Sequence, residues 1–152
     1  MATNGTDALK EPAEYADLLP GERLNNHVLV LDDNTDILTT VRRIAVRAGY
    51  AVTTVERTDS FVEKFKAEKP SMVILDIVLG SQDVMSVIDF LGKEQFAAPV
   101  VLMSGYDHRM LRAVAEVARD RGLRIAGSVE KGAGLERLAP LLEAHHLGGR
   151  QL

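Results

Sequence analysis

Short runs of apolar, partly β-branched residues recur along this chain, and each run is bounded by polar residues. Such runs are typical of strands that are buried on both faces of a parallel sheet. They predict strands at residues 28–32, 51–56, 72–76, 99–103 and about 124–129. Between the strands, apolar positions recur at the helical spacing. This spacing predicts one helix that Asn34 or Thr35 caps and that runs to about Ala48, and others at about 59–68, 82–93, 108–121 and 135–146.

The strict alternation of strands and helices determines the fold class. Right-handed crossovers place alternating elements in one parallel sheet with helices on both faces. We therefore expect an α/β domain over residues 27–147, after a polar, flexible N-terminal extension at 1–26 and before a C-terminal tail at 148–152. Pro140 lies inside the last predicted helix, so this helix either starts later than Leu135 or bends.

Composition narrows the classes of partner. The chain has 152 residues, 46% of them hydrophobic and 26% charged, which is typical of a globular domain. A net charge of −4 argues against nucleic acid as a partner. We expect no membrane association and a cytoplasmic location, because no apolar run could cross a bilayer and the N-terminus does not resemble a signal peptide. The absence of cysteine excludes disulfides and thiolate metal sites.

Residues that can bind or accept a phosphoryl group lie where the predicted strands end. The first strand ends at Asp32 and Asp33, the third at Asp76 and the fourth at Ser104, while Lys131 follows the fifth. In an open parallel sheet these ends share one edge, where ligands bind. Three carboxylates suit a hard divalent cation such as Mg²⁺. Asp76 can then attack phosphorus, while Ser104 and Lys131 bind phosphoryl oxygens.

Four segments resemble one known family. VLVLDDN, MVILDI, VVLMSG and VEK occur in the order and spacing of the receiver domain of two-component response regulators, over about residues 27–147. The resemblance implies a flavodoxin-like, doubly wound sheet of five parallel strands in the order 2-1-3-4-5, with five helices.

The resemblance also implies a role for each site residue. Asp76 matches the phosphorylated aspartate. Asp32 and Asp33 match the acidic pair that holds Mg²⁺ together with Asp76, and Asp33 would be the more direct ligand. The main-chain carbonyl of Val78 would be a further metal ligand. Ser104 matches the family's switch hydroxyl, and Lys131 matches its phosphate-binding lysine.

The chain departs from the family pattern at four positions. Ser128 replaces an aromatic residue on the fifth strand, and Gly132 replaces the proline after the lysine. Gly80 and Val84 replace a proline and a glycine after the phosphorylated aspartate. Without proline the Lys131–Gly132 peptide should be trans, because the cis form costs about 2.5–4 kcal/mol.

These departures raise the question of which aromatic residue reports phosphorylation. Ser128 has no ring that could turn between buried and exposed positions. Tyr106, two residues after Ser104, is the candidate switch aromatic. The competing interpretation is that Tyr106 only packs against its loop.

The leading interpretation is a stand-alone response regulator. A sensor histidine kinase or a histidine phosphotransfer protein would phosphorylate it, and it would signal to an output protein by contact or act as a phosphate relay or sink. A homodimer is left open. It would be no enzyme beyond its own phosphoryl transfer and hydrolysis. The alternative is a non-phosphorylated receiver-like adaptor or dimerisation module. A phosphatase with an aspartyl-phosphate intermediate is disfavoured, because Val78 stands where such enzymes need a second acid.

Overall fold

The computed structural model describes residues 26–105 and 107–147. Five strands form one sheet in the order β2-β1-β3-β4-β5, and every neighbouring pair is parallel. The strands are β1 (His27–Leu31), β2 (Ala51–Val55), β3 (Met72–Asp76), β4 (Pro99–Ser104) and β5 (Arg124–Glu130). The predicted strand order is confirmed.

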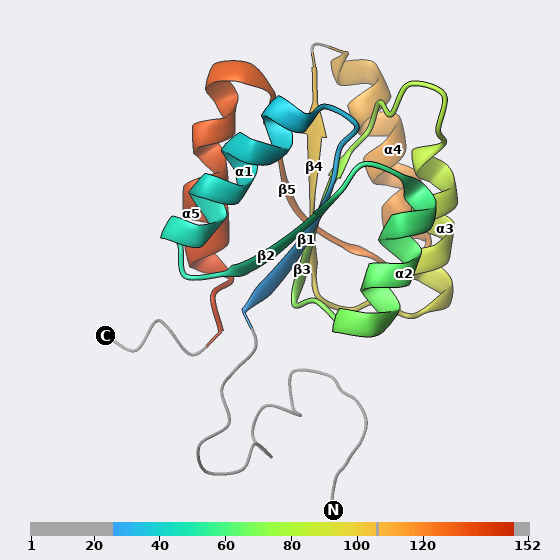
Figure 1. The fold of residues 1–152 in the computed structure, drawn as a ribbon. Coiled ribbons are helices and arrows are strands. Elements are labelled where there is room, and N and C mark those ends of the chain that lie inside the picture. Colours follow the sequence, from blue (N-terminus) through green and yellow to red (C-terminus); the bar gives the residue numbers. More distant parts are fainter. Residues whose placement is uncertain (1–25, 106, 148–152) are drawn as a thin grey trace, which may run out of the picture.

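Helices cover both faces of this sheet (Figure 1). One face carries α1 (Thr35–Arg47) and α5 (Leu138–Ala144), and the other carries α2 (Thr58–Glu68), α3 (Val84–Lys93) and α4 (His108–Asp120). The doubly wound, flavodoxin-like fold with five helices is therefore confirmed. Each strand-to-helix turn lies at the upper edge of the sheet in Figure 1.

The core consists of two apolar clusters, one on each face of the sheet. Side chains alternate between faces along a strand, so β3 supplies both clusters. Val73 and Leu75 pack with α2, α3 and α4, whereas Met72 and Ile74 pack with α1 and α5. All four side chains are fully buried. Burial on both faces explains why the central strands are continuously apolar in the sequence.

The last helix begins later than residue 135. Gly132–Arg137 forms a 3-10 turn, and α5 starts only at Leu138. Pro140 then lies in the first turn of α5, where backbone N–H groups have no partner within the helix. The proline therefore breaks no hydrogen bond of the helix, and the start later than Leu135 that the sequence analysis offered is observed.

The connection between α1 and β2 is joined to α5. Gly49, with φ of 94°, ends α1 in the left-handed conformation that glycine adopts without steric cost. The next residue, Tyr50, is buried, and its hydroxyl donates a hydrogen bond of 2.7 Å to the carbonyl oxygen of Leu142. The ring of His146 packs edge-on against Tyr50 at 5.4 Å between centroids.

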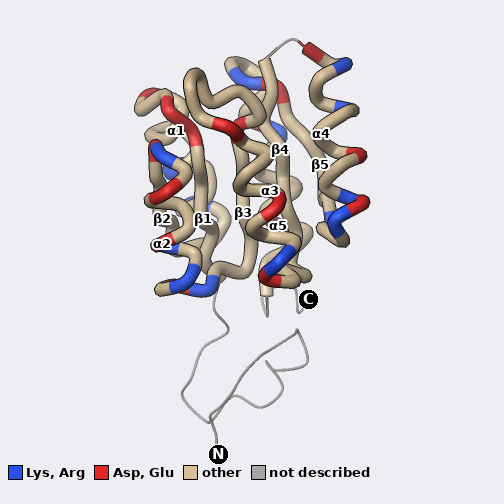
Figure 2. Tube along the Cα trace, turned by 90° about the vertical axis from the view of Figure 1, so that its right-hand side faces the viewer, with Lys and Arg blue, Asp and Glu red and all other residues tan. Residues whose placement is uncertain are grey.

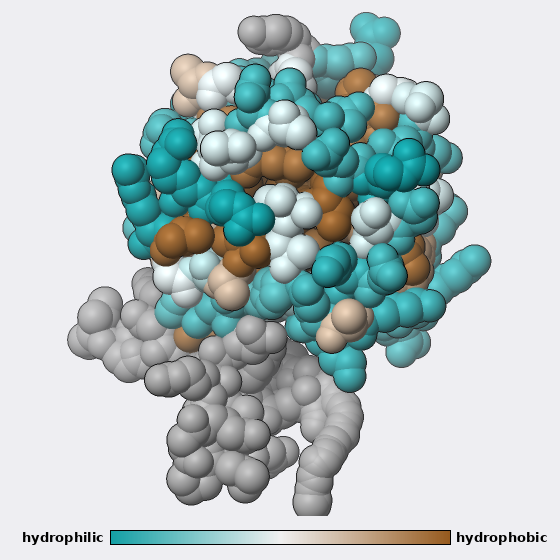
Figure 3. Space-filling view, in the orientation of Figure 1, coloured by the Kyte–Doolittle hydropathy of each residue, from teal (hydrophilic) through white to brown (hydrophobic). Residues whose placement is uncertain are grey.

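The surface of the described residues is mixed in character. Figure 2 shows acidic and basic positions interspersed along the helices. In the view of Figure 3, hydrophilic side chains break the apolar surface into separate areas. The large apolar residues that are exposed are Val46, Val78 and Met110. No helix in the described ranges has the length and apolarity needed to span a membrane.

Replacing Tyr50 with phenylalanine should lower the free energy of unfolding by about 1 kcal/mol, because a buried hydrogen bond to the Leu142 carbonyl is lost. Urea unfolding followed by circular dichroism measures the change. Thr39→Val is the control, since it removes an exposed hydroxyl that bonds the Thr35 carbonyl within α1. Equal stability of Tyr50→Phe and the unmodified protein would show that this bond contributes nothing.

Candidate functional site

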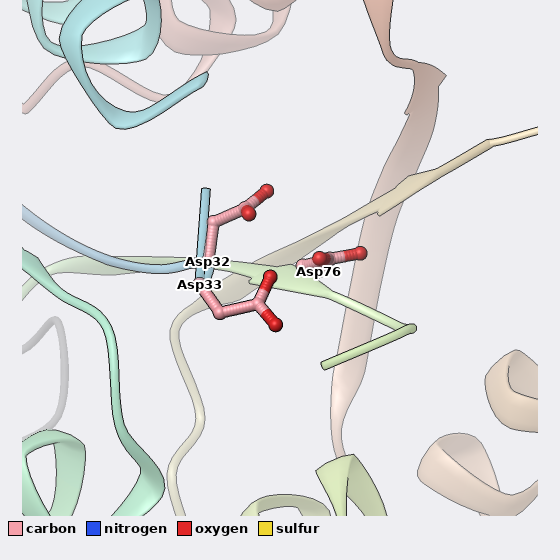
Figure 4. Close-up of side chains that lie close together, drawn as sticks. All are labelled: Asp32, Asp33 and Asp76. Carbon is pink, nitrogen blue, oxygen red and sulfur yellow. The ribbon is translucent and has the colours of Figure 1, made fainter. Parts of the chain in front are cut away.

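Three aspartates lie together where β1 and β3 end. The two strands are paired with Leu31 opposite Leu75, so the residues that follow them reach the same edge of the sheet. One carboxylate oxygen from each of Asp32, Asp33 and Asp76 lies within 4.8 Å of the others. Figure 4 shows the side chains of Asp32 and Asp33 diverging from consecutive backbone positions. Asp32 and Asp76 are fully buried, whereas Asp33 is exposed.

The turn from β1 into α1 fixes Asp32. Its backbone N–H donates to the carbonyl of Val55, and its Oδ1 accepts a 2.8 Å hydrogen bond from the N–H of Asn34. Asn34 in turn caps α1, because its side chain accepts from the N–H groups of Asp36 and Ile37. The capping turn therefore holds the carboxylate at the edge of the sheet.

Lys131 connects the two buried carboxylates. Its Nζ donates a 2.7 Å hydrogen bond to Asp76 Oδ2 and forms an ion pair of 3.1 Å with Asp32 Oδ2. The second oxygen of Asp76 accepts a 3.0 Å bond from the N–H of Val78. The backbone N–H of Lys131 donates to the carbonyl of Ser104, which places the lysine beside the end of β4.

The electrostatics of the site follow from burial and charge. Burial raises the pKa of Asp32 from 3.8 to about 6, and the charge of Asp76 adds to this effect while Lys131 opposes it. For Lys131, burial lowers the pKa, but the hydrogen bond to Asp76 and the charge of Asp32 outweigh it and raise the pKa overall. The site thus has three carboxylates and one ammonium, which contacts Asp32 and Asp76, so acidic groups outnumber the basic one.

Two buried oxygens in this site lack a hydrogen bond within the described part of the chain. They are Ser104 Oγ and Asp32 Oδ2, of which the second keeps its ion pair with Lys131. Such atoms are rare in folded proteins and mark positions where a ligand can complete the contacts. The three carboxylates with an unsatisfied oxygen fit a hard divalent cation, which prefers oxygen donors.

Other residues singled out in the sequence have different placements. The side chain of Val78 is exposed, and its carbonyl as a metal ligand stays a prediction. Tyr106 lies outside the described residues. Ser128 is exposed on β5. His108 pairs with Glu130 at 3.2 Å and is not part of the aspartate cluster.

The backbone at Gly132 explains one departure from the family pattern. No cis peptide bond occurs in residues 26–105 and 107–147, so the Lys131–Gly132 bond is trans, as predicted. Gly132 has φ of 79°, a conformation that proline cannot adopt because its ring fixes φ near −65°. The conformation of the turn that follows Lys131 therefore excludes proline and favours glycine.

Sequence reasoning missed Gln82. Its side chain joins the loop after Asp76 to the connection between β2 and α2 through backbone groups of Thr58 and Glu56. Backbone partners leave no pattern in the sequence, so no signal pointed to this residue.

Comparisons with known proteins agree with this geometry. Residues 28–140 match the family model of the response regulator receiver domain. Nitrogen assimilation regulatory protein NtrX of Azorhizobium caulinodans is 30% identical over 118 residues, covering 76% of this chain and 25% of NtrX. The transcriptional regulatory protein PhoP of Bacillus subtilis, which controls alkaline phosphatase synthesis, is 29% identical over 84 residues, covering 55% of this chain and 35% of PhoP. The chain thus spans about a third or less of these relatives.

One similar solved structure contains a phosphorylated aspartic acid and a metal ion. A response regulator from Burkholderia pseudomallei, with a phosphorylated aspartic acid and a calcium ion, superposes with a TM-score of 0.65 at 29% identity. The match covers 78% of this chain and 66% of that one. With the fold, the aspartate cluster and the family match in agreement, the chain belongs to the response regulator receiver domains, the phosphoacceptor domains of two-component signalling.

Proposed function

We propose that this protein is phosphorylated on Asp76 in a Mg²⁺-dependent step by a sensor histidine kinase or a histidine phosphotransfer protein. The observation that carries the proposal is the position of the Asp76 carboxylate. It is buried at the end of β3, hydrogen-bonded to Lys131 and within 4.8 Å of oxygens of Asp32 and Asp33. The calcium ion and phosphorylated aspartate of the Burkholderia pseudomallei neighbour support it.

Each side chain has a distinct part in the transfer. An Asp76 oxygen forms the bond to phosphorus while the phosphorus–nitrogen bond of the donor's phosphohistidine breaks and its imidazole leaves with the electron pair. Asp32, Asp33 and Asp76 would hold Mg²⁺, which supplies positive charge against the repulsion between carboxylate and phosphoryl oxygens. Lys131 already binds Asp76 and can pair with a phosphoryl oxygen. The Ser104 hydroxyl has no partner among the described residues and can donate to another.

The finer parts of the sequence interpretation stay predictions. They are the stand-alone organisation, output by protein contact or as a phosphate relay or sink, the cytoplasmic location and the homodimer. The expected lack of a nucleic-acid partner also stays a prediction. The adaptor alternative differs in a measurable respect, because an adaptor of that kind would take no phosphoryl group on Asp76.

Incubation with a small-molecule phosphodonor and Mg²⁺ should add the mass of one phosphoryl group to the intact protein. Asp76→Asn and an excess of chelator should each abolish the gain, because they remove the nucleophile and the cation. Asp59→Asn, an exposed aspartate at the start of α2, is the matched control and should still gain the mass. A gain that survives in Asp76→Asn would refute the assignment.

Removing the exposed carboxylate should weaken Mg²⁺ binding. In Asp33→Ala we expect the dissociation constant to rise roughly tenfold or more, because affinity depends on the number of charged oxygen ligands. Calorimetric titration measures it. His108→Ala is the control, since His108 pairs with Glu130 outside the aspartate cluster. Unchanged affinity in Asp33→Ala would mean that the cation lies elsewhere.

Asp32→Asn should stabilise the metal-free protein at pH 7.5 by roughly 1–3 kcal/mol. The folded-state pKa of Asp32 is about 6, above the unfolded value of 3.8, so ionisation of this group lowers the free energy of unfolding as the pH rises through this window. The gain should therefore shrink toward pH 4. Urea unfolding at several pH values measures it, and a gain that is independent of pH would contradict this electrostatic origin.

Saturating Mg²⁺ should reverse the order of stability. Binding to the folded state alone stabilises a protein, and the unmodified site binds the cation more tightly than Asp32→Asn does. The same unfolding experiment with added Mg²⁺ checks this, with Ca²⁺ as a second hard cation.

A further inference from the structure

A single side chain fastens the loop after Asp76 to a neighbouring loop. Gln82 Oε1 accepts a 2.7 Å hydrogen bond from the backbone N–H of Thr58, and Gln82 Nε2 donates a 3.0 Å bond to the carbonyl of Glu56. The backbone N–H of Gln82 also donates to the carbonyl of Leu79, which closes the loop on itself. The connections β2–α2 and β3–α3 are thus joined by two directed bonds.

The bond to Thr58 replaces a missing helix cap. Arg57 occupies the N-cap position of α2, and its side chain makes no capping hydrogen bond. The first N–H groups of a helix need a partner from outside the helix. Gln82 supplies it from the next connection along the chain, so the start of α2 and the loop after β3 are held in a fixed relation.

This loop lies against the aspartate cluster at two points. The N–H of Val78 donates to Asp76 Oδ1. Gly80 has φ of 64°, and a Cβ added to it would lie 3.0 Å from Asp33 Oδ2. The backbone of the loop therefore passes directly beside the exposed carboxylate, and small shifts of the loop change the space around Asp33.

We propose that Gln82 is a positioning residue for the metal and phosphoryl site. By tying the β3–α3 loop to the β2–α2 connection, it sets how the loop backbone lies against Asp33 and Asp76. This inference rests on the function proposed above. A physical reason for such a tie is the composition of the loop, because Gly80 and Ser81 leave its backbone more freedom than a proline would. Ligands of a metal site depend on supporting hydrogen bonds for their geometry.

The test compares Mg²⁺ affinity in matched variants. Gln82→Met keeps a side chain of similar length and removes both side-chain bonds. We expect its Mg²⁺ dissociation constant, measured by calorimetry, to rise about tenfold, which is the low end for loss of a supporting group. Amide hydrogen exchange at Thr58 and at residue 82, whose N–H bonds the Leu79 carbonyl, should become faster. Gln82→Ala is the second variant if the methionine variant does not fold.

Two controls separate positioning from general destabilisation. Asp59→Ala removes the acidic side chain that accepts from the Ser60 N–H in the first turn of α2, without touching Gln82. Tyr50→Phe destabilises the opposite face of the sheet. Both controls should bind Mg²⁺ as tightly as the unmodified protein.

Each contrary outcome overturns a defined statement. Faster exchange in Gln82→Met with unchanged Mg²⁺ affinity would show that Gln82 only connects the two loops and does not position the metal site. An equal loss of affinity in Asp59→Ala would assign the effect to α2 and not to the loop. No Mg²⁺ binding by the unmodified protein would refute the proposed cation site and this inference with it. Mg²⁺ binding without phosphorylation of Asp76 would refute the phosphoryl transfer while leaving the effect of Gln82 on the cation intact.

Discussion

The ammonium of Lys131, held between two buried carboxylates, is the interaction on which the site depends. β1 and β3 are neighbours in the sheet, so Asp32 and Asp76 are forced together out of contact with water, where like charges repel strongly. A compensating charge has to come from a strand nearby. β5 lies beyond β4, and the long stem of Lys131 reaches across the end of β4, where the Ser104 carbonyl holds its backbone. The strand order is thus what allows a cation to meet the acidic pair.

Even with Lys131 in place, the site lowers the stability of the folded protein, and the rest of the fold offsets this loss. The raised pKa of Asp32 and the Ser104 hydroxyl, which has no hydrogen-bond partner among the described residues, both indicate polar groups held away from their preferred surroundings. The two apolar clusters on either side of the sheet supply the stability that permits this. Strain of this kind is common where a site is organised for a ligand that completes its charges and hydrogen bonds. The same excess of negative charge that costs stability is what attracts a divalent cation.

The sequence predicts well those features that depend on the type of side chain at each position. Burial on both faces requires continuous apolar residues, so the central strands could be predicted from the pattern, whereas the strand order was implied by the resemblance to the receiver family. The three aspartates, Ser104 and Lys131 follow strand ends and could be named because parallel strands end at one edge. The features that were missed depend on backbone partners far along the chain. Gln82 bonds the backbone of Thr58 and Glu56, and neither partner leaves a pattern in the sequence around Gln82.

Two departures from the family pattern, Gly80 and Gly132, have a common physical basis. Both glycines adopt positive φ, which proline cannot do, and the side chains that carry the chemistry are present beside them. A proline restrains a loop through its own ring, whereas a glycine leaves the restraint to hydrogen bonds from elsewhere. At Gly80 the side chain of Gln82 supplies them, and beside Gly132 the bond between the Lys131 N–H and the Ser104 carbonyl does so. The restraint on the loop after Asp76 then comes from the side chain of Gln82, which bonds backbone groups of Thr58 and Glu56 and none of the three aspartates.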